Sequence, residues 1–201
     1  MHAFTRALLL CATMASAFLA QPAKARATRL RATDTSEVEA VLAEKYPSFA
    51  SFLKMVQDAE ESTLAKQLQA ADDGVTIFVP SEAAFEALGD KKRAQLKDVR
   101  NEETVGQIAS YHCIAEPVTK AKLYDSGGVV TIGGTLSIGQ TRTGGFFGIF
   151  GGEEDGGVTI NGATIIDSTE VGTSIVHEMD KFVAPQALWR FMDMLRIPGS
   201  R

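Results

Sequence analysis

The run Val-Thr-Ile-Phe-Val at residues 75–79, closed by a proline, constrains the fold of this chain more than any other stretch. Its β-branched and aromatic side chains leave too little polarity for water on either face, which predicts a strand covered on both sides. Pro80 cannot donate to a strand ladder and ends the strand, and Ser81 can cap a following helix through its hydroxyl. Phe85 and Leu88 lie on one face of that helix. The stretch therefore predicts a buried strand that runs directly into a helix.

Helical periodicity recurs in five further stretches of the first half of the chain. Ser36 and Glu39 form a capping box at the start of the first stretch, and Asn101 is placed to cap the last. One of the stretches carries mostly charged side chains, which indicates a short solvated helix. The expected helices cover residues 36–46, 49–56, 64–68, 91–99 and 101–111.

The second half of the chain changes to the two-residue period of strands. Two hairpins are expected, because Gly-Gly separates residues 129–132 from 135–138 and Asn-Gly separates 158–160 from 163–166. A further strand is expected over residues 173–182. Helices come first and strands after, apart from the one early strand. This order predicts an α+β fold rather than alternating βαβ units.

The first residues indicate export. An apolar run over 7–17, too short to span a bilayer, follows Arg6, and small-x-small motifs lie at 15–17 and 23–25, as in a secretory signal peptide. A signal peptide over residues 1–25 implies an extracellular destination. A cut after Ala17 would instead leave a basic, transit-like leader over 18–33, which implies a complex plastid. Both alternatives stay open.

The remaining chain is long enough for one core, since 45% of the 201 residues are hydrophobic. We expect a helix or linker over 34–48, a single domain over 49–185 and an amphipathic helix over 186–201. That last helix either docks on the domain or binds a surface, and docking is favoured. No stretch predicts a transmembrane anchor. The apolar side chains of the last helix are Leu188, Trp189, Phe191, Met192 and Leu195.

The charge balance argues against a nucleic-acid partner. The chain carries 20 Lys and Arg against 25 Asp and Glu, and loss of residues 1–25 would remove Arg6 and Lys24 and leave a net charge of −7. Phosphate backbones are bound by basic faces, and the sequence has no Lys/Arg stripe with interleaved aromatic residues.

No cofactor, metal site or catalytic group is predicted. Cys113 is the one cysteine outside the signal peptide, and with His112 and His177 it shows no recognised ligand spacing. Ser174, His177 and Asp180 are the residue types of a hydrolase triad. On a strand, however, Ser174 and Asp180 share one face while His177 points to the other. The sequence therefore predicts a protein without enzymatic activity.

Three boxes in fixed order resemble the fasciclin domain family. Residues 76–85 are similar to the family's first box, a Thr-hydrophobic-Phe-hydrophobic-Pro strand followed by a Ser/Thr-x-x-Ala-Phe helix. Tyr111 and His112 resemble the family's tyrosine–histidine pair, and residues 175–185 resemble its closing box. The resemblance covers residues 49–185, the length of one such domain.

The resemblance implies a fold and a function. It implies a compact wedge of two small β-sheets with several helices packed around them, acting as an adhesion or matrix-interaction module without catalysis. The chain departs from the pattern at 171–174, where the family usually has Asn-Gly, and it contains no Arg-Gly-Asp. The implied partner is a protein or a glycan-rich matrix. The alternative is a small-ligand or lipid binder in an organelle lumen, such as that of a plastid.

Two candidate contact sites follow. The resemblance maps a binding role onto Tyr111 and His112, although such a pair can equally form a buried tie between a helix and a strand. The second site is a glycine-rich loop over 143–157, whose apolar side chains show no periodic face. They either fold back as a lid or form an exposed patch for a partner or a membrane surface. These side chains are Phe146, Phe147, Ile149 and Phe150.

Overall fold

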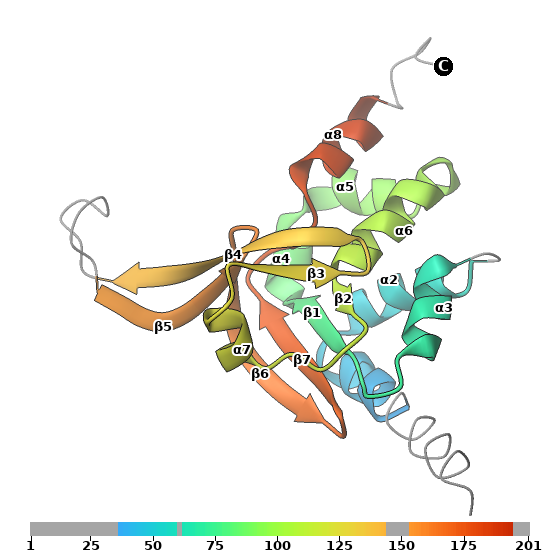
Figure 1. Cartoon of the computed structure of the whole chain (residues 1–201). Helices are drawn as coiled ribbons and strands as arrows, with labels where there is room; N and C mark the ends of the chain where they lie inside the picture. Colours follow the sequence, from blue (N-terminus) through green and yellow to red (C-terminus); the bar gives the residue numbers. More distant parts are fainter. Residues whose placement is uncertain (1–35, 60–61, 144–152, 195–201) are drawn as a thin grey trace, which may run out of the picture.

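The structure is a computed structural model that describes residues 36–59, 62–143 and 153–194 (Figure 1). Residues 36–45 are helical. The further helices are α2 (Pro47–Gln57), α3 (Thr63–Ala70), α4 (Glu82–Ala87), α5 (Gly89–Leu96), the 3₁₀ turn η1 (Val99–Asn101), α6 (Glu102–Tyr111), α7 (Lys120–Tyr124) and α8 (Gln186–Met194). The strands are β1 (Thr76–Pro80), β2 (Cys113–Ile114), β3 (Gly128–Thr131), β4 (Gly134–Thr143), β5 (Glu153–Ile160), β6 (Ala163–Val171) and β7 (Ser174–Met179).

The strands form one seven-stranded sheet in the order β2-β1-β7-β6-β5-β4-β3. β1 and β7 are parallel, and every other neighbouring pair is antiparallel. The sheet curls until its edges approach, and the backbone N–H of Ile132 donates to the carbonyl of Cys113 at 2.8 Å. The predicted α+β class is confirmed. The expected two small sheets are instead one continuous sheet, because β5 pairs with β6 at Thr159–Thr164 and Ile160–Ala163 and so joins the two halves.

β1 lies inside the sheet and is buried along its whole length, as its sequence predicts. Its side chains alternate between two cores. Ile77 and Val79 pack into the core on the helical side, whereas Phe78 packs into the core enclosed by the curled sheet. The hydroxyl of Thr76 donates to the carbonyl of Glu116 at 2.8 Å and so ties the following loop to the strand.

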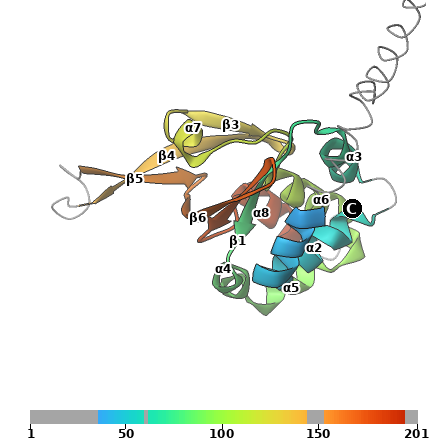
Figure 2. The same cartoon turned by 90° about the horizontal axis from the view of Figure 1, so that it is seen from below.

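All labelled helices except α7 gather at one side of the sheet, and the β4–β5 hairpin projects away from them (Figures 1 and 2). The helical core contains Phe49, Phe52 and Leu53 of α2 together with Val105 and Ile108 of α6. α7 contacts β4 and β5 instead, and its Leu123 closes the second core. Two cores therefore share one wall, the β1–β7 pair.

Local signals fix the turns around the sheet. The hydroxyl of Ser81 accepts from the N–H of Ala84 at 3.2 Å, which confirms the predicted cap of α4. Asn161 and Gly162 have φ angles of 50° and 82°, as a tight hairpin turn with two positive φ values requires. Asn101 differs from expectation, because its side chain donates to the carbonyl of Gln95 at 2.9 Å rather than capping α6.

The expected loop over 143–157 is shorter than predicted. β4 continues to Thr143 and β5 begins at Glu153, so the two strands extend into the glycine-rich stretch. Strand propensity does not predict this extension, because glycine is unfavourable in strands. The strands form here because the two segments pair with each other. Phe146, Phe147, Ile149 and Phe150 lie outside the described residues.

α8 docks on the helical core. Trp189 and Met192 are buried, and the carboxylate of Asp193 lies 2.8 Å from the ammonium of Lys91 in α5. The buried face of α8 differs from the predicted one, because Phe191, which was expected on that face, is 47% exposed. The indole of Trp189 takes the inner position instead, between the Phe182 ring and the Lys92 ammonium. No helix in the described part of the chain is long and apolar enough to cross a membrane.

We expect Gly74→Ala to lower the free energy of unfolding by roughly 2 to 3 kcal/mol. Gly74 has a φ of +108°, and a Cβ there would lie 2.5 Å from the carbonyl oxygen of Thr173. Gly89→Ala is the matched control, since φ is +74° and nothing lies within 4 Å of the new Cβ. It should cost only about 1 kcal/mol. Urea unfolding of both variants measures the difference, and equal losses would contradict the steric part of the argument.

Candidate interaction surface

His112 is a structural tie in the core. Its ring is fully buried, and Nδ1 donates to the carbonyl of Ile108 at 2.8 Å while Nε2 accepts from the N–H of Val183 at 3.3 Å. The rings of Phe49 and Phe182 lie 5.6 and 5.1 Å away. Burial lowers the pKa of His112 to about 4, so the ring is neutral at physiological pH. A direct contact between His112 and a partner would require the ring to leave the core.

Tyr111 lies beside this tie and is half-buried. A Cβ on Gly133 would lie 2.7 Å from the Tyr111 nitrogen, and one on Gly134 would lie 3.0 Å from its hydroxyl. The paired glycines at the β3–β4 turn therefore let the Tyr111 ring pack directly on the backbone. The N–H of Gly133 also donates to the carbonyl of Ser110 at 3.0 Å, which fastens the turn to the end of α6. The binding role of Tyr111 and His112 stays a prediction.

His177 is the second fully buried histidine. Its Nε2 donates to the carbonyl of Val118 at 2.9 Å, and the hydroxyl of Ser168 donates to its Nδ1 at 2.7 Å. Burial is the main cause that lowers the pKa of His177. Ser174 and Asp180 bond elsewhere: the Ser174 hydroxyl accepts from Val75 and the Asp180 carboxylate from Thr164. These three residues of the supposed triad are not brought together.

Sequence reasoning missed the Ser168–His177 contact. The two residues lie on neighbouring strands and face each other across the β6–β7 register. A hydrolase histidine is oriented by a carboxylate on the nitrogen opposite the nucleophile. Here that nitrogen bonds a backbone carbonyl. The pair therefore anchors β6 and the Val118 loop to β7, and an alternation pattern on the two strands gives no sign of it.

Cys113 is also inert by burial. The thiol is fully buried and is a free thiol rather than half of a disulfide. Burial raises its pKa to about 12, so the reactive thiolate is not formed at neutral pH. In residues 36–59, 62–143 and 153–194, no three His, Cys, Asp or Glu side chains are grouped to hold a metal ion.

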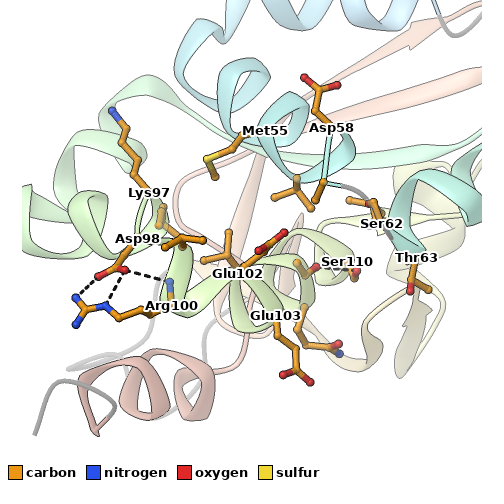
Figure 3. Close-up of a pocket in the computed structure, with 18 of the residues that line it drawn as sticks. Met55, Asp58, Ser62, Thr63, Lys97, Asp98, Arg100, Glu102, Glu103 and Ser110 are labelled. Atoms are coloured by element: carbon orange, nitrogen blue, oxygen red, sulfur yellow. Dashed lines mark hydrogen bonds and ion pairs between the residues drawn. The ribbon is translucent and has the colours of Figure 1, made fainter.

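An open groove of about 1060 Å³ lies on the helical side of the domain (Figure 3). Its walls come from the end of α2, the start of α3, η1 and the outer face of α6, and we call it the α2–α6 groove. Met55 of α2 points into it and is 40% exposed, and Val99 of η1 is 78% exposed. Ser110 and Ile132 line the far end of the groove. Both lie next to the place where Tyr111 packs on the β3–β4 turn. The Tyr111 side chain itself does not line the groove and packs against both cores.

Acidic side chains rim the α2–α6 groove. Asp58 lies at the end of α2, and Glu102 and Glu103 lie on α6 across from it (Figure 3). Among the described lining residues the cations are Lys97 and Arg100. The guanidinium of Arg100 lies 2.6 Å from the Asp98 carboxylate, which largely neutralises it. The groove therefore carries an excess of negative charge around exposed apolar groups.

The sequence offered separate signals for this groove. Asp58 appears as part of a polar break between helices, and Glu102 and Glu103 appear as first-turn acids of α6. Both have an ordinary explanation, and nothing local indicates that they face each other.

These observations define an α+β domain whose buried polar groups hold the fold together and whose distinctive surface is an open groove. Residues 47–185 match the family model of the fasciclin domain, and the chain belongs to the fasciclin domain family. Domains of this family mediate adhesion and protein interactions, generally without catalysis, and are typically found in secreted or extracellular proteins.

Two individual proteins are similar to this chain. The protein sll1483 of Synechocystis sp. is 26% identical over 163 residues, which cover 76% of this chain and 83% of that protein. A structure of a FAS1 domain pair from the insect cell adhesion molecule Fasciclin I is 19% identical, with a TM-score of 0.47. The match covers 63% of this chain, which spans 45% of the length of that structure.

Proposed function

We propose that this domain is a non-enzymatic interaction module that binds a protein or a glycan-rich matrix, and that the α2–α6 groove is its main contact surface. The exposure of Met55 and Val99 carries the proposal. Both side chains line one groove, and apolar groups gathered in a surface depression favour contact with a partner. The charged rim is typical of a protein-binding surface, whose centre is apolar and whose edge is polar.

Tyr111 remains a proposed contact next to the far end of the α2–α6 groove, although its own side chain does not line the groove. Its neighbours Ser110 and Ile132 line the groove, and its own side chain is half-buried. His112 would contribute indirectly, because its bonds to Ile108 and Val183 fix the end of α6. The loop residues Phe146, Phe147, Ile149 and Phe150 remain a second proposed contact, to a partner or a membrane surface.

The alternative function, a small-ligand or lipid binder, gains no specific support from the groove. The groove is open to solvent and rimmed by charges, whereas pockets for such ligands enclose most of the ligand in apolar surroundings. The proposed destination is the secretory pathway, ending outside the cell or in a complex plastid. It depends on residues 1–35, which lie outside the described part of the chain.

A capture experiment with immobilised protein distinguishes the two proposed contacts. We expect wild-type protein to capture partners from a matrix or plastid fraction and the variant M55S/V99S to lose them, with unchanged thermal stability. Val130→Ser is the matched control, because Val130 is 70% exposed on β3 and outside the groove. The loop variant F146S/F147S/F150S tests the second contact.

The outcomes are read by mass spectrometry of the captured material. Loss of partners in M55S/V99S alone supports the groove, and loss in the loop variant alone transfers the contact to the loop. A lipid or pigment that co-purifies with wild-type protein, with no protein captured, would contradict the proposal and support the alternative function.

A further inference from the structure

The placement of Asp58 is not explained by the stability of its helix. Asp58 is the C-cap of α2, where the negative end of the helix dipole disfavours a carboxylate. Glu102 and Glu103, by contrast, lie in the first turn of α6, where the dipole favours them. Asp58 therefore stands at the rim at a local electrostatic cost to its helix.

Gly106 gives a second sign that the groove is kept open. It lies in the middle of α6 and lines the groove, and a Cβ added there would meet nothing within 4 Å. Alanine would fit and is the better helix former. The glycine leaves the groove wall without a side chain at this position, at the expense of helix stability.

The side chains that line the α2–α6 groove favour one class of partner. None of the described lining side chains is aromatic, and sugar rings are commonly held by stacking on aromatic faces. Sulfated or carboxylated glycans would be repelled by Asp58, Glu102 and Glu103. A bare cation is not favoured either, since no three-ligand group is found in the described chain. A positively charged polypeptide with apolar side chains satisfies both features of the groove.

We infer that the α2–α6 groove binds a polypeptide segment in which leucine-like side chains alternate with arginine or lysine; this inference rests on the proposed function. The apolar side chains would cover the exposed side chains of Met55 and Val99. The guanidinium or ammonium groups would reach Glu102 and Glu103 on one side and Asp58 on the other. Long basic side chains suit this arrangement, because their aliphatic stems pack on apolar surface while their charges stay at the rim.

A fluorescent peptide with two leucines alternating with three arginines tests this inference with the full chain. Fluorescence anisotropy should show binding with a dissociation constant on the order of 10 μM. The variant E102Q/E103Q should bind about fivefold more weakly, because two exposed charge pairs are lost. The matched control D167N/E170Q removes the same charge from exposed carboxylates of β6 and should change the affinity less than twofold.

Two further peptides complete the test. A peptide with serine in place of leucine and one with glutamate in place of arginine should both bind at least tenfold more weakly. The inference is overturned by equal binding of the serine peptide, by equal losses in the two variants, or by absence of binding to the arginine peptide. If the arginine peptide fails while M55S/V99S still loses captured proteins, the proposed function stands and only the partner chemistry is wrong.

Discussion

Replacement of Phe78 by aspartate should leave the chain unable to fold. The ring of Phe78 is fully buried and stacks on His177 at 5.7 Å with 21° between the planes. Loss of the ring alone costs about 3 to 5 kcal/mol. Placing a carboxyl group among Ile114, Val158 and Met179 of the same core adds several kcal/mol more. Together these terms match the whole stability of an ordinary domain, about 5 to 15 kcal/mol.

Far-ultraviolet circular dichroism and size-exclusion chromatography of the purified variant measure this result. Ile166→Asp is the control, because Ile166 is 55% exposed on β6 and the same substitution there should leave the fold intact. Phe78→Leu keeps an apolar side chain and should fold with reduced stability. A Phe78→Asp protein that elutes as a compact, folded species would contradict the assignment of β1 as the shared wall of both cores.

Acidification should destabilise the domain between about pH 6.5 and pH 4 through its buried histidines. The pKa of His112 is about 4 in the folded protein and 6.5 in the unfolded chain, because burial disfavours the charged ring. Between these values the unfolded chain binds a proton that the folded protein does not, so stability falls as pH falls. His112 alone accounts for roughly 3 kcal/mol over this range, at about 1.4 kcal/mol per pH unit. His177, whose pKa is also lowered, acts in the same direction.

Urea unfolding across this pH range measures the loss, and proton NMR of the imidazole C–H groups follows each histidine directly. High salt is the control, since it screens surface carboxylates but not a desolvation effect. The loss should therefore persist at high salt. A free energy of unfolding that stays constant from pH 6.5 to pH 4 would refute the neutral, buried state of His112.

Local signals predicted the parts of the fold that local chemistry decides. Pro80 and Ser81 end β1 and start α4 as expected, and Asn161-Gly162 forms its tight turn. The pairings of β1 with β7 and with β2 were not predicted, because they join segments far apart in sequence. β1 and β7 are almost a hundred residues apart, and β2 is only two residues long. A short stretch of sequence contains no signal for either pairing.

The candidate surface was less accessible to sequence reasoning than the fold. The burial of His112 was one of two alternatives, and only packing against Phe49 and Phe182 decides it. The α2–α6 groove combines Met55, Val99 and Glu102 from three separate elements. Each of these side chains has an ordinary local interpretation. These side chains form a candidate surface only because the fold brings them together. Periodicity and composition do not predict that proximity.

The parallel pairing of β1 with β7 has a mechanical consequence. Five residue pairs, from Thr76–Ile175 to Pro80–Met179, join these strands side by side. Tension applied between the start of β1 and the end of β7 pulls the two strands along their length, so the bonds between them are loaded in shear and share the force. A force applied across the strands would instead load these hydrogen bonds one at a time. The arrangement gives a small adhesion-type domain resistance to stretching at its centre, where both cores meet.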